Sequence, residues 1–82
     1  MKYVDLLQSI SHPDQRYSGL TSNIDTRLAA HNAGQSPHTS NFHPWQIVTY
    51  HAFHDERKAA AFETYLKSGS GRAFGYKHFW SD

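Results

Sequence analysis

The chain contains no cysteine, so disulfide bonds and cysteine-ligated zinc are excluded as sources of stability. It also lacks any apolar run approaching the ~18 residues that would suggest a membrane span. The first five residues carry one lysine and then an acid, which does not fit a secretory signal. A cytoplasmic location is therefore expected.

A strong charge of either sign is missing as well. Eight Lys and Arg residues against seven Asp and Glu give a formal net charge of +1. Domains that hold nucleic acid by bulk electrostatics usually carry a dense basic face, which this balance does not predict. Any binding of phosphate must be local or assisted by a divalent cation, and charge alone neither proposes nor excludes a nucleic-acid substrate.

The apolar and aromatic content of the chain suffices for the core of one small domain spanning residues 1–82. Apolar residues make up 38% of the chain and aromatic residues 15%, enough for a small core. Residues 3–8 and 16–21 read as two strands of a hairpin, joined by a turn around His12-Pro13-Asp14. Residues 45–53, rich in β-branched and aromatic side chains, predict a third strand.

Helices are expected between and after these strands. Ser22 and Asp25 resemble a capping box at the start of the first helix, which Asn32-Ala33-Gly34 would end. A second helix is expected to begin after Asp55.

Gly69 and Gly71 should end that second helix, and residues 72–80 are expected to form a short third one. The order β-β-α-β-α, with this last helix added, predicts an α+β fold in which helices pack on a mixed or antiparallel sheet.

Three segments together resemble the GIY-YIG nuclease family. They are RYSGLTSNIDTRLAAHNAG, PWQIVTY and AAAFETYLKSGSGR, and they occur in the family's order and spacing over nearly the whole chain. The resemblance implies a three-stranded antiparallel sheet flanked by two to three helices. It also implies metal-dependent hydrolysis of DNA phosphodiester bonds. The sequence itself gives no sign of a membrane span or of an obligate protein partner.

Functional residues follow from the resemblance position by position. Tyr17 matches the second-motif tyrosine that helps activate the attacking water, and Arg27 matches the arginine that stabilises charge on the phosphate. His31 lies where some members place a histidine near the active site. Glu63 matches the carboxylate that binds one Mg²⁺ or Mn²⁺, and Gly19 matches the glycine that lets a neighbouring group approach the strand.

The chain departs from the family pattern at two positions. Asp5 stands where the first-motif tyrosine is expected, and Tyr3 on the same strand face is roughly 7 Å away along the strand. Loss of one positioned acid-base group typically lowers a rate by about 10²–10⁴-fold. Asp5 would add a metal ligand, act as a base or repel the phosphate. Ser18 replaces a usually apolar residue.

Other polar residues leave two interpretations open. Lys67 and Arg72 flank a glycine-rich segment and either contact a nucleic-acid backbone or simply end a solvated helix. Trp45 and Trp80 fit core or lid positions better than base-stacking platforms.

Histidine pairs suggest zinc only weakly. His51 and His54 are spaced like ligands but straddle the end of a strand, and His38 and His43 flank a loop. No pair has an evident third and fourth ligand.

The resemblance to the GIY-YIG family implies a metal-dependent endonuclease, either fully active or weakened at Asp5. The alternative is a non-catalytic nucleic-acid-binding module, and a purely structural domain is less favoured.

Overall fold

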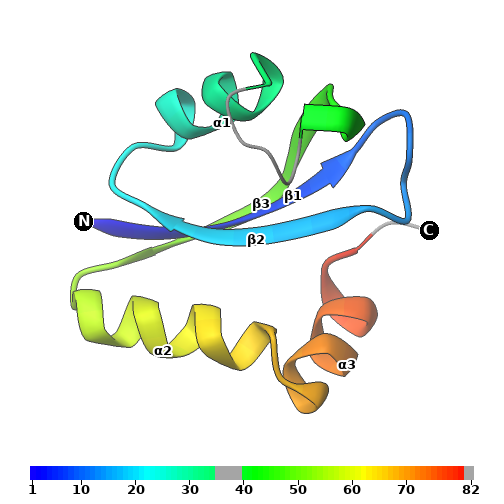
Figure 1. Ribbon diagram of the computed structural model, residues 1–82. Coiled ribbons are helices and arrows are strands. Elements are labelled where there is room, and N and C mark those ends of the chain that lie inside the picture. Colours follow the sequence, from blue (N-terminus) through cyan, green and yellow to red (C-terminus); the bar gives the residue numbers. More distant parts are fainter. Residues whose placement is uncertain (35–39, 81–82) are drawn as a thin grey trace.

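A computed structural model describes residues 1–34 and 40–80 of the chain. Its centre is a three-stranded antiparallel sheet of β1 (Lys2–Ser9), β2 (Arg16–Thr21) and β3 (Trp45–Phe53) (Figure 1). The strand order is β2-β1-β3, so β1 is central and β2 has an open edge. The predicted hairpin, the third strand and the α+β class are confirmed.

Helices cover both faces of this sheet. α1 (Ile24–Asn32) lies on one face, whereas α2 (Glu56–Leu66) and α3 (Gly69–His78) lie on the other (Figure 1). A single 3-10 turn, η1 (Ser40–Phe42), precedes β3. Within the described residues no helix has the length and apolar character that crossing a membrane requires.

Burial of β1 on both faces explains its composition. Val4 and Leu6 point to the α2 side and form the core with Ala59 and Leu66. Asp5, between them in sequence, points to the α1 side because successive strand residues alternate in direction. Its exposure is only 1%. The alternation that builds the core therefore also places a carboxylate in the interior.

The start of α1 differs from the prediction. Asn23, not Ser22, caps the helix, and its side chain accepts a hydrogen bond from the backbone N–H of Thr26 at 3.0 Å. Thr21 Oγ1 accepts from the Asn23 N–H and donates to the Asn23 carbonyl, forming a turn that moves the cap one residue along. Asp25 is in the first turn, as expected.

The glycines after α2 do not end that helix, contrary to the prediction. α2 stops at Leu66, and Ser68 then caps α3 by accepting from the Gly71 N–H at 3.1 Å. Gly69 and Gly71 thus belong to α3. A Cβ at Gly71 would lie 1.7 Å from the carbonyl oxygen of Tyr65, so glycine is needed there for the close approach of the two helices.

The C-terminal end of α1 is tied to the start of β3. The Asn32 side-chain oxygen accepts from the backbone N–H of Trp45, and its Nδ2 donates to the carbonyl of Trp45 at 3.2 Å. One amide side chain therefore satisfies both backbone groups of a strand residue. This contact fixes the last turn of α1, which carries His31, over the sheet.

Candidate active site

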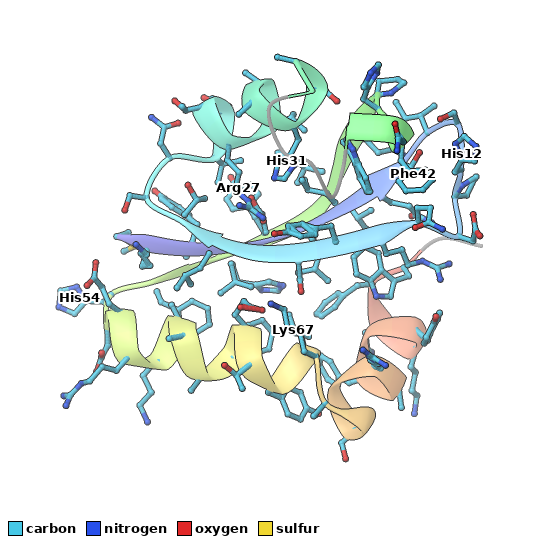
Figure 2. All side chains as sticks on the ribbon, viewed as in Figure 1. His12, Arg27, His31, Phe42, His54 and Lys67 are labelled. Carbon is cyan, nitrogen blue, oxygen red and sulfur yellow. The ribbon has the colours of Figure 1, made fainter. Side chains whose placement is uncertain are left out.

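Five residues that the sequence singled out come together on the α1 face of the sheet. Arg27 and His31 reach from α1 toward the strands (Figure 2). Arg27 Nε lies 2.6 Å from Asp5 Oδ2, and its guanidinium carbon lies 5.2 Å from the centre of the Tyr17 ring. The rings of Tyr17 and His31 are 5.2 Å apart. Gly19, the fifth, pairs with Asp5 across β1 and β2.

The Asp5–Arg27 ion pair is the electrostatic centre of this cluster. The side chains are 1% and 17% exposed, so solvent screens the pair only weakly. Burial raises the pKa of Asp5 above its ordinary value of 3.8, while the charge and hydrogen bond of Arg27 oppose that rise. The carboxylate at the position of the expected tyrosine is therefore the partner of Arg27.

Gly19 provides the space that this ion pair needs. A Cβ built on Gly19 would lie 1.7 Å from Arg27 Nη2 and 2.4 Å from its guanidinium carbon. The arginine thus crosses β2 directly over the glycine to reach Asp5. The close approach anticipated at this position is made by the side chain of Arg27.

We expect Gly19→Ala to destabilise the protein by about 1–3 kcal/mol, the usual cost of overpacking, because the methyl group would push Arg27 away from Asp5. Urea unfolding followed by circular dichroism measures the change. Gly69→Ala is the matched control, since nothing lies within 4 Å of a Cβ there. Equal stability of the two variants would contradict the predicted crowding.

His31 is buried and held in its neutral form. Its exposure is 5%, and its pKa is lowered from 6.5 by burial and then by the nearby charge of Arg27. A neutral imidazole can accept a proton, and the adjacent Tyr17 ring carries a hydroxyl group. The pair therefore has the chemical groups for proton transfer at the edge of the sheet.

Glu63 lies on α2, on the opposite side of the sheet from Arg27. Its Oε2 pairs with Lys67 Nζ at 3.0 Å, one turn further along the helix. The Glu63 side chain is 17% exposed, whereas that of Lys67 is 58% exposed. Figure 2 shows Lys67 at the end of α2 beneath the sheet. The sequence did not reveal that the sheet separates Glu63 from the α1 cluster.

A groove lies along β2, an edge strand of the sheet. It has a volume of about 430 Å³ and is bordered by β2, the end of α2 and α3. Its charged and aromatic lining residues include Arg16, Tyr17, Lys67, Arg72, Tyr76 and Trp80. Tyr17 thus touches Arg27 and His31 and also lines the groove that Lys67 borders. Of the residues in the α1 cluster, Tyr17 is therefore the one that also lines the groove.

Comparison with known proteins identifies the family of the chain. The family model of the GIY-YIG catalytic domain matches residues 6–77. The chain belongs to the GIY-YIG family. No curated protein and no solved structure matches it.

The candidate metal ligand of this GIY-YIG domain is a single carboxylate, which would suit a cation that keeps most of its water ligands. Across residues 1–34 and 40–80, no three His, Asp or Glu side chains are grouped so that they could hold a metal ion. Glu63 is a single carboxylate whose described ion-pair partner is Lys67. Mg²⁺ keeps several waters and often binds through one or two carboxylates, so the site fits Mg²⁺ better than zinc.

The histidines outside the cluster do not form a metal site in the described region. His51 packs between the rings of Phe62 and Phe79, with centroids 5.2 and 5.1 Å away, and burial lowers its pKa from 6.5. His54 lies just before the N-terminal end of α2, away from Lys67 at the other end (Figure 2). His38 lies outside the described residues. Aromatic packing therefore accounts for His51.

Sequence reasoning missed part of the groove. Arg16 and Tyr76 were not singled out, and Trp80 was interpreted as a core or lid residue. Arg72 and Tyr76 are four residues apart, which places them on one face of α3 and offered a signal. Ser18 also lines the groove and is half-buried, so its hydroxyl is not enclosed in an apolar core.

Proposed function

We propose that this GIY-YIG domain is a metal-dependent endonuclease that hydrolyses DNA phosphodiester bonds at the open edge of β2. The position of Tyr17 is the observation that carries the proposal. Its ring contacts His31 and Arg27 on one side, and it lines the groove bordered by Lys67 on the other. A phosphate bound at this edge would be accessible to groups from both faces.

Each side chain has a role that its chemistry allows. Tyr17 helps to activate the attacking water, and neutral His31 takes up the proton. Arg27 stabilises negative charge on the phosphate, an action that its pairing with Asp5 weakens. We therefore expect slow cleavage.

Glu63 would hold the divalent cation at the α2 side of this edge. Bound Mg²⁺ or Mn²⁺ would neutralise charge on the phosphate and lower the pKa of a nearby water. Lys67 neutralises the Glu63 carboxylate in the structure described here, and its exposed, flexible chain can turn away toward a DNA phosphate.

Replacing Glu63 by Gln should abolish metal-dependent nicking of supercoiled plasmid, with a loss of about 10²-fold or more, because a metal contributes several kcal/mol to the transition state. Calorimetric titration with Mn²⁺ should lose its binding signal in parallel. Glu56→Gln, an exposed carboxylate in the first turn of the same helix, serves as the control. Unchanged nicking by Glu63→Gln would refute the assignment.

The alternative function is a nucleic-acid-binding module without catalysis. The Asp5–Arg27 pair favours it, because the arginine is already neutralised inside the protein. DNA binding by the wild type without cleavage under Mg²⁺ or Mn²⁺ would support this alternative over the endonuclease.

A further inference from the structure

We infer that the groove beside β2 binds a single-stranded DNA segment, with a base stacked at Tyr76 and the adjoining phosphates held by Arg72 and Lys67. The inference rests on the proposed function, because it names the form of DNA that the same edge accepts. The charge of the groove, its aromatic residues and its size each support the inference.

The charge of the groove is positive on a nearly neutral protein. Arg16, Lys67 and Arg72 line it against a single acid, Asp14. Glu63 compensates Lys67 in part. The ion pairs of the described residues do not include Arg72, which is exposed at the groove wall. The groove thus offers cationic groups for local phosphate contacts on a protein whose net charge is only +1.

Aromatic rings lie beside these charges. The guanidinium carbon of Arg16 lies 4.9 Å from the centre of the Tyr76 ring and 5.8 Å from that of Trp80. Tyr76 is nevertheless 63% exposed, an unusual amount for a large aromatic side chain. Alternating cations and aromatic rings are how single-stranded nucleic acid is held, since every base has a face that stacks.

The size of the groove and the need for an exposed base face favour a single strand over a duplex. The volume of about 430 Å³ is within the range of roughly 300–1,000 Å³ that small ligands occupy. A duplex offers a protein its phosphates and the edges of its bases, not their faces. Stacking on Tyr76 requires an unpaired base. A flap, overhang or splayed nucleotide next to the scissile bond meets that requirement.

Binding without cleavage provides the test. Fluorescence anisotropy in EDTA compares an oligo-dT of about 8 nucleotides with the same length of duplex. The wild type should prefer the single strand. Tyr76→Ala should weaken single-strand binding by about 5- to 150-fold, Tyr76→Phe should retain it, and Tyr50→Ala, which removes another exposed tyrosine, should leave it unchanged.

Salt dependence tests the phosphate contact separately. Arg72→Ala should reduce the slope of log affinity against log salt by about 0.7, the value for one phosphate contact on a single strand. Arg57→Ala is the control, since that side chain is 95% exposed at the start of α2. Circular dichroism confirms that each variant is folded.

The outcomes separate this inference from the proposed function. Equal single-strand binding by wild type and Tyr76→Ala, or a preference for duplex, overturns the groove assignment even if plasmid is cleaved. Binding that depends on Tyr76, with no cleavage under Mg²⁺ or Mn²⁺, supports the groove while the endonuclease proposal fails.

Discussion

Arg27→Ala should lower the free energy of unfolding by about 3–5 kcal/mol at neutral pH, because it leaves Asp5 as an unpaired charge in the interior. The Asp5 side chain is 1% exposed, so water solvates its carboxylate poorly. Urea unfolding at neutral pH measures the loss. A decrease below about 1 kcal/mol, the level of a surface ion pair, would show that Asp5 has another source of solvation.

The same variant should have a distinct pH dependence. A carboxyl group whose pKa is raised on folding contributes stability below its ordinary value of 3.8, and this contribution is lost as pH rises through the folded-state pKa. Removing Arg27 removes the main influence that lowers the pKa of Asp5. The deficit of Arg27→Ala relative to wild type should therefore shrink toward about pH 4 and reach its full size above the raised pKa.

A double variant separates the ion pair from general loss of packing. Asp5→Leu combined with Arg27→Met removes both charges and keeps apolar side chains in their place. Replacing a buried ion pair by apolar residues is often neutral or stabilising. We expect the double variant to be much more stable than Arg27→Ala. If both unfold at the same urea concentration, the isolated charge is not the cause.

Local patterns predicted most of the fold. Alternation identified the first two strands and put Val4 and Leu6 on the face opposite Asp5, whereas β-branched and aromatic composition identified the third strand. The start of α3 was missed because Gly69 and Gly71 are usually helix breakers. Close contact between α2 and α3, a tertiary effect, overrides that preference at Gly71.

The candidate site was only partly readable from the sequence. Family resemblance selected Tyr17, Arg27 and His31, which the fold brings together. The pairing of Asp5 with Arg27 joins residues 22 positions apart and has no local signal. Nor does one segment predict the groove, because two helices and a strand edge form its walls. Such features arise from three-dimensional arrangement.

The Asp5–Arg27 ion pair is also expected to limit the rate of cleavage. Asp5→Tyr should increase metal-dependent cleavage of plasmid by about 10²-fold or more relative to wild type, because it restores an acid-base group typically worth about 10²–10⁴-fold. The change also releases Arg27 to the phosphate. The larger ring adds about 1–3 kcal/mol of crowding, which the removal of a buried charge offsets in part.

Asp5→Phe distinguishes the two contributions, since it frees Arg27 equally but has no hydroxyl. A gain in Asp5→Tyr well above that in Asp5→Phe would assign it to proton transfer, whereas equal gains would assign it to the arginine. When Arg27→Ala is added to the Asp5→Tyr variant, most of the increase should disappear. If the folded Asp5→Tyr and Asp5→Phe proteins both cleave no faster than wild type, Asp5 does not limit the reaction, and the ion pair serves stability alone.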